Sequence, residues 1–198
     1  QLLGGQVRDR IRIYGHIGGV GGKDGYTHNP VVEDVKEMLV SADIQLARGL
    51  TAVKFAPSDG LEHIDTAQEL KNIVSRVTAV REHVGDKIDI ALDFHGRFSL
   101  AMARRVFPYL EPLNLLFIEE PVLPEFTDKF DLIVASTSTP IATGERLFDR
   151  NDYKDVLRSG IAVAQPDLSH AGGISECRRI ATMAEAYDVA VAPHCPLG

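Results

Sequence analysis

The chain has 198 residues, a formal net charge of −7, and hydrophobic side chains at 44% of its positions. That size and composition are typical of one globular α/β domain with a substantial core, so we treat residues 1–198 as a single domain. The negative charge argues against nucleic acid or an anionic membrane surface as a partner, and the absence of a run of about 18 apolar residues argues against a membrane-spanning helix.

The two ends of the sequence and its cysteines give further expectations. The start at Gln1 has no basic segment followed by a long apolar stretch, so we expect no signal peptide. Cys177 and Cys195 form no CxxC pair, so neither a disulfide framework nor a thiolate zinc site is expected. A reducing cytoplasm is the default location for such a chain.

Short apolar runs alternate with amphipathic stretches along the sequence. The predicted strands are 11–17, 51–55, 88–93, 115–119, 140–144, 162–166 and 189–193. The predicted helices are 31–48, 62–82, 99–110, 127–136, 151–158 and 174–187. Two of these helices follow residues that are typical N-caps, Ser99 and Asn151.

The spacing of the predicted strands is that of βα units rather than hairpins. Continuous apolar strands favour a parallel sheet that is buried on both faces, and seven such units favour a TIM-type barrel over the alternative of a doubly wound open sheet. A closed eight-stranded barrel usually needs about 250 residues. We therefore expect an incomplete barrel of about seven βα units that lacks the eighth strand.

Three of the predicted strands end in an acidic residue at equal intervals along the chain. Asp93, Glu119 and Glu145 are each separated by 26 residues, so consecutive strands would carry them to the same mouth of the barrel. Carboxylates that converge repel each other unless a cation lies among them, and ligation by oxygen alone favours Mg²⁺ over Zn²⁺. Alternatively, each acid caps the following helix or pairs with Arg97 or Arg146.

The sequence strings around these acids carry a family resemblance. DFHGR, FIEEP and TGERLF make the chain similar to the catalytic domain of the mandelate racemase group of the enolase superfamily. The resemblance implies that Mg²⁺ binds to Asp93, Glu119 and Glu145, with Glu119 chosen over Glu120. It also implies an N-terminal α+β cap domain and a glutamate on an eighth strand, and neither falls within these 198 residues.

Two further strings narrow the expected reaction. QPDLSHAGG at 165–173 and APHCPLG at 192–198 are similar to galactonate dehydratases. This resemblance implies Mg²⁺-dependent dehydration of an aldonic acid, with D-galactonate favoured, to a 2-keto-3-deoxy acid through loss of the C2 proton and the C3 hydroxyl.

Two histidines are the candidate proton carriers. His95 follows Asp93 by two residues, which places both side chains on one side of an extended segment, and the resemblance implies that it is the general acid. His194 and Asp167 end neighbouring predicted strands, and the resemblance makes His194 the base and Asp167 the carboxylate that orients it. Alternatively, both histidines are structural, with His194 packed against Pro193.

The second predicted strand departs from the racemase pattern. Racemases of this group carry Lys-x-Lys there, whereas this chain has Lys54, Phe55 and Ala56. The missing second lysine disfavours a two-base racemase and favours a dehydratase that uses two histidines. Lys54 either binds the substrate carboxylate or balances the acidic mouth, and Arg146 is a second candidate for substrate binding. The turn residue His170 is expected to be structural.

Several functional alternatives stay open at this point. Another sugar-acid dehydratase would act on mannonate or gluconate, a non-catalytic barrel would only bind a metal or a carboxylate, and an aldolase would form a Schiff base with Lys54. The expected partners are a small sugar acid and further copies of the chain in a homo-oligomer, with Mg²⁺ as the one cofactor.

Overall fold

The computed structural model describes residues 3–18, 35–58 and 60–194. Within them, seven parallel strands form one sheet in the order β1-β2-β3-β4-β5-β6-β7, so each strand pairs with its neighbours in the chain. The strands are β1 (Gly15–His16), β2 (Ala52–Phe55), β3 (Asp89–Asp93), β4 (Phe117–Glu119), β5 (Ile141–Thr143), β6 (Val163–Ala164) and β7 (Ala190–Val191). The order never reverses, which excludes the doubly wound alternative and confirms the TIM-type arrangement.

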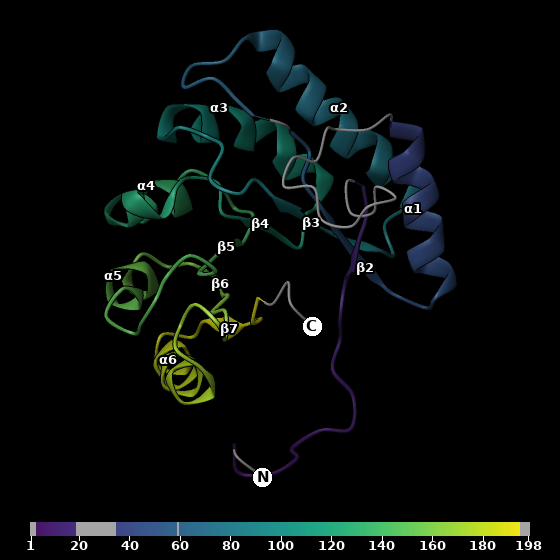
Figure 1. Cartoon of the computed structure of the whole chain (residues 1–198). Helices are drawn as coiled ribbons and strands as arrows, with labels where there is room; N and C mark the ends of the chain where they lie inside the picture. The colour runs from purple at the N-terminus through teal and green to yellow at the C-terminus, as the bar shows by residue number, and fades with distance from the viewer. Residues whose placement is uncertain (1–2, 19–34, 59, 195–198) are drawn as a thin grey trace.

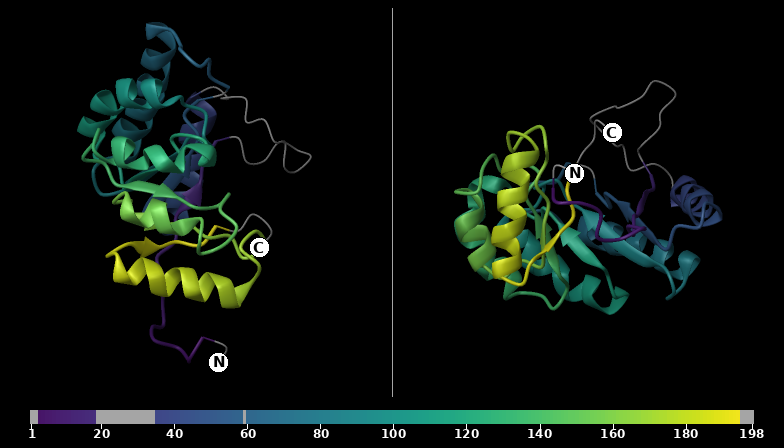
Figure 2. Two further views of the ribbon diagram at one scale, coloured as in Figure 1. Left: turned by 90° about the vertical axis from the view of Figure 1, so that its left-hand side faces the viewer. Right: turned by 90° about the horizontal axis from the view of Figure 1, so that it is seen from below.

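Helices follow the strands and cover one face of the sheet. They are α1 (Val35–Ala47), α2 (Ala67–Val84), α3 (Leu100–Leu110), α4 (Phe130–Val134), α5 (Tyr153–Arg158) and α6 (Ile174–Ala186), with 3-10 turns η1 (Glu111–Leu113) and η2 (Pro124–Lys129). The sheet curls as part of a barrel wall, and the helices lie on its convex side (Figures 1 and 2). None of the described helices has the length and apolar character needed to cross a membrane.

The alternation of side chains along each strand divides the structure into an outer core and an inner face. In β3, Ile90 and Leu92 are fully buried and belong to the large core between sheet and helices, whereas Ala91 belongs to a small cluster with Phe117 and Ala142 on the concave side. Asp93 follows Ala91 by two residues and therefore shares its side of the strand. The same alternation carries functional side chains inward on the neighbouring strands.

Most predicted elements are confirmed, although the strands are shorter than expected. The Ser99 hydroxyl caps α3 by accepting the Met102 N–H at 3.2 Å, as predicted. The prediction that Asn151 caps the next helix is wrong, because the Asp149 carboxylate accepts the N–H groups of Asn151 and Asp152, and α5 begins only at Tyr153. The predicted helix 127–136 is instead a 3-10 turn followed by the short α4.

Two predicted features lie partly outside the described residues. The first is the helix expected from residue 31, whose first four residues are not described. The second is the string at 192–198, whose last four residues, including Cys195, are not described.

Candidate functional site

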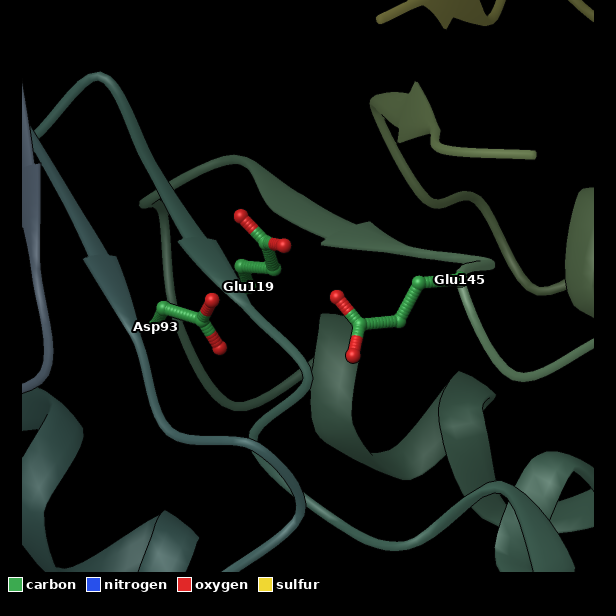
Figure 3. Close-up of side chains that lie close together, drawn as sticks. All are labelled: Asp93, Glu119 and Glu145. Carbon is green, nitrogen blue, oxygen red and sulfur yellow. The ribbon is translucent and has the colours of Figure 1, made fainter. Parts of the chain in front are cut away.

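The three predicted metal ligands converge at the carboxyl ends of neighbouring strands. Asp93 ends β3, Glu119 ends β4 and Glu145 follows β5, and their carboxylates point toward one another (Figure 3). One oxygen from each lies within 4.8 Å of the others. Asp93 is 3% exposed, Glu119 is 0% exposed and Glu145 is 9% exposed, so all three are buried.

Strand register and one glycine produce this convergence. Asp93 is paired with Glu119 across the β3–β4 ladder, so both project from the same level of the concave face. Glu145 follows Gly144, whose φ of 142° is rarely adopted by residues with side chains. A Cβ at Gly144 would meet the Tyr153 hydroxyl and lie 2.9 Å from the Gln165 nitrogen. The glycine thus lets the chain turn closely past β6 and direct Glu145 to the other two acids.

Lys54 supplies a positive charge inside the cluster. It projects from β2, is 3% exposed, and places its Nζ 3.1 Å from Asp93 Oδ2 and 2.5 Å from Glu119 Oε2. Burial alone would lower the pKa of Lys54, but the two carboxylates raise it by more, so the amine stays protonated. A Schiff-base nucleophile must be a neutral amine, so this environment argues against the aldolase alternative.

One lysine does not neutralise three carboxylates. Burial and then repulsion by Glu120, Asp93 and Glu119 raise the pKa of Glu145 to about 9. Burial and repulsion by Asp93 raise the pKa of Glu119 to about 7, although Lys54 opposes the shift. Burial also disfavours the ionised form of Asp93, but Lys54 and His95 more than offset this effect and lower the pKa of Asp93.

Two carboxylate oxygens in the cluster lack the partners that burial normally requires. Within the described part of the chain, Glu119 Oε1 and Glu145 Oε2 are buried and accept no hydrogen bond. Buried acceptors without donors are costly, and a hard cation bound by carboxylates would satisfy both and remove the repulsion. The donor set, its burial and its unsatisfied oxygens therefore fit a divalent cation.

His95 lies at one end of the carboxylate cluster. Its Nε2 is 3.2 Å from Asp93 Oδ2, and its backbone N–H donates to Asp93 Oδ1 at 3.0 Å. The predicted proximity is confirmed, but the segment is not extended, because His95 has a φ of 47°. Burial lowers the pKa of His95, while Asp93 raises it and Arg97 lowers it. The side chain remains 44% exposed, so its ring is accessible from the mouth.

His194 lies at the other end and is paired with Asp167. Its Nδ1 is 2.8 Å from Asp167 Oδ2, and its Nε2 is 3.4 Å from Glu145 Oε2. A carboxylate accepts, so Nδ1 carries the hydrogen and Nε2 of the neutral ring holds the lone pair beside the cluster. Burial raises the pKa of Asp167, but the hydrogen bonds from the His170 N–H, from His194 and from the Ser169 N–H lower it by more. The carboxylate is therefore an ionised partner for the imidazole.

Glu120 has a different environment from Glu119, although the two are adjacent in sequence. It has a φ of 40° and is 1% exposed, and its carboxylate accepts three hydrogen bonds from Arg146, at 3.1 Å, 3.0 Å and 2.6 Å. The alternative stated from the sequence paired Arg146 with one of the three cluster acids, whereas its ion-pair partner in the structure is Glu120. A substrate contact by Arg146 stays a prediction.

Two neighbours of the site make contacts that the sequence did not predict. Tyr14 lies under the ammonium of Lys54, with Nζ 5.4 Å from the ring centroid, and packs edge-on against Phe117. His170, expected to be only structural, bonds through Nδ1 to the Glu145 carbonyl at 2.6 Å. Neither contact has a local sequence signal, because each joins residues from different βα units.

Comparison with known proteins gives the family. Residues 37–198 match the family described as enolase C-terminal domain-like. The chain belongs to this family. D-galactonate dehydratases of Variovorax paradoxus (strain S110) and Verminephrobacter eiseniae (strain EF01-2) are 44% and 46% identical to it over 199 residues. Each alignment covers 100% of this chain and 49% of the relative.

Solved structures agree with that placement in the enolase family. An enolase from Agrobacterium radiobacter, with bound Na and L-malate, has a TM-score of 0.84 and 36% identity, over 100% of this chain and 48% of that one. The chain thus spans about half the length of these enolase-family relatives.

Proposed function

We propose that this protein is a Mg²⁺-dependent sugar-acid dehydratase, with D-galactonate as its substrate. One observation carries the proposal: a buried cluster of three carboxylates has a histidine at each end, and one of these histidines is oriented by a carboxylate. The similarity to D-galactonate dehydratases supports the choice of reaction and substrate.

The carboxylates of Asp93, Glu119 and Glu145 would hold the cation. When bound, Mg²⁺ supplies a Lewis acid that stabilises the negative charge developing on the substrate carboxylate. A charge of this kind is needed because a proton beside a carboxylate is only weakly acidic. Lys54 adds a second positive charge at the same place, because its ammonium lies beside Asp93 and Glu119.

The two histidines divide the proton transfers. His194 Nε2 takes the C2 proton, and the ionised Asp167 stabilises the imidazolium that forms, in the manner of an Asp–His pair in a catalytic triad. His95 gives a proton to the C3 hydroxyl, which leaves as water with the electrons of the C3–O bond. The resulting enol tautomerises to the 2-keto-3-deoxy acid, so the substrate has lost one water.

The test uses two variants of the full-length gene product, His194→Asn and His95→Asn, in which an amide replaces the imidazole. His194→Asn should abolish both dehydration and exchange of the C2 hydrogen with deuterium from solvent. His95→Asn should reduce dehydration on the order of 10²-fold or more, as expected for loss of a general acid, while C2 exchange stays measurable.

Metal binding provides the control for both variants. Neither histidine is a proposed ligand, so Mg²⁺ should bind each variant as it binds the wild type, as measured by calorimetry. Dehydration retained by His194→Asn would contradict the assignment of the base. Loss of Mg²⁺ binding in His95→Asn would contradict the division between ligands and proton carriers.

A further inference from the structure

A third histidine lies beside the proposed base and is held by the same group of strand ends. Asp167 Oδ1 accepts the backbone N–H groups of Ser169 at 2.7 Å and His170 at 2.9 Å, which defines a tight turn after β6. The other oxygen of this carboxylate is the one that contacts His194. The turn that orients the base therefore also places His170.

The ring of His170 has a defined tautomer. Its Nδ1 lies 2.6 Å from the Glu145 carbonyl oxygen, which can only accept, so Nδ1 carries the hydrogen. Nε2 of the neutral ring is then an acceptor on the opposite edge, pointing away from the carbonyl. Among the residues that the structure describes, no hydrogen-bond partner is found for Nε2.

The surroundings of His170 place this acceptor at the mouth of the site. His170 is exposed, and its ring centroid is 6.5 Å from that of His194 with an interplanar angle of 31°. On another side, the ring of Phe148 lies 6.3 Å away and is itself 64% exposed. A fixed acceptor therefore lies beside the ring of His194, and an exposed apolar ring lies beside that acceptor.

We propose that His170 binds a hydroxyl group of the sugar acid through Nε2 and is a specificity-determining residue of this site. The inference rests on the proposed function, because it requires a polyhydroxy acid whose C2 lies at His194. The C3 hydroxyl leaves as water, and the C2 hydroxyl lies next to the carboxylate that the cation would bind, so the proposal assigns to His170 a hydroxyl on a carbon beyond C3. An acceptor held by a backbone carbonyl discriminates hydroxyl positions because its ring cannot turn to follow the ligand.

Two substitutions of His170 distinguish the role of Nε2 from the role of Nδ1. His170→Asn keeps an amide N–H near the position of Nδ1, so the bond to Glu145 can persist, but it has no atom at the position of Nε2. His170→Gln has the opposite effect, because its longer side chain carries a polar group near Nε2 and removes the Nδ1 donor. Both are measured in the full-length gene product with saturating Mg²⁺, on D-galactonate and on analogues that lack the hydroxyl at C4, C5 or C6.

His170→Asn should lower kcat/KM for D-galactonate about ten-fold, mainly through KM, with unchanged melting temperature and unchanged Mg²⁺ affinity. For one deoxy analogue, wild type and His170→Asn should have equal kcat/KM, which identifies the hydroxyl. His170→Gln should retain part of the discrimination between D-galactonate and that analogue.

Three results would overturn the inference. If His170→Asn has wild-type kinetics on every substrate, Nε2 contacts none of them, although the proposed function stands. If it loses the same factor on every analogue, or if Mg²⁺ affinity falls with it, the residue acts through Glu145 as a support. If the wild-type protein dehydrates no sugar acid at all, the proposed function fails and this inference fails with it.

Discussion

Replacing Glu145 by glutamine tests the electrostatics of the carboxylate cluster without any assay of activity. Glu145 has a pKa raised to about 9, so in the metal-free folded protein it holds its proton far above the pH at which the unfolded chain releases it. Between the unfolded pKa and the folded pKa, the native state therefore binds more protons than the unfolded state. The free energy of unfolding must then fall as pH rises through this window.

The magnitude follows from linkage. One proton bound only by the native state changes the free energy of unfolding by about 1.4 kcal/mol per pH unit. From pH 6 to pH 8 the unfolded chain has already released this proton while native Glu145 keeps it, so roughly 2 to 3 kcal/mol of stability is lost over this interval. This is an upper limit, because Glu119 titrates in the same range and the two groups share their repulsion. Glutamine keeps the shape of the side chain and removes the titration.

The assay is urea unfolding of chelator-treated wild type and Glu145→Gln at pH 6, 7 and 8. The variant should be the more stable protein at pH 8, and its advantage should grow with pH. Added Mg²⁺ should stabilise the wild type, and more strongly at pH 8 than at pH 6 because binding requires the ionised carboxylates, while the variant should respond little. A stability difference that is independent of pH would refute the claim that these acids crowd one another in the absence of a cation.

Two further substitutions test the supports of the cluster. Arg146→Met should lower the free energy of unfolding by roughly 3 kcal/mol, because it leaves Glu120 buried without its partner. In a double-mutant cycle, adding Glu120→Gln should restore much of this loss. Additive losses in free energy would contradict the pairing. Gly144→Ala should lower the melting temperature and weaken Mg²⁺ binding measured by calorimetry. The reason is that the added Cβ would meet Tyr153 and Gln165 and displace Glu145. Unchanged metal affinity would show that the turn tolerates a side chain.

Much of the fold could be predicted from the sequence because its determinants are local. Apolar runs at βα spacing predicted the strands, and a polar residue before an amphipathic run predicted the cap at Ser99. The same reasoning was wrong at Asn151, because Asp149 lies close enough to compete: its carboxylate accepts the N–H groups of Asn151 and Asp152, and α5 begins only at Tyr153. Local patterns of polar residues do not reveal which of them wins such a competition.

The equal spacing of Asp93, Glu119 and Glu145 predicted their convergence, because parallel strands connected by helices bring their carboxyl ends to one edge. Sequence alone therefore determined which strand ends carry the acids. It could not determine which of two adjacent glutamates faces the cluster: spacing treats Glu119 and Glu120 almost alike, and only the family resemblance chose between them.

Tertiary structure decided that question and the partners of the remaining groups. The positive φ of Glu120 turns its side chain to Arg146, and the register of β3 with β4 sets Glu119 beside Asp93. The bond from His170 to the Glu145 carbonyl likewise joins two turns that are 25 residues apart in sequence. Such contacts depend on backbone dihedral angles and on the distance between strand ends, and these become defined only when the helices pack against the sheet and hold the strands in register.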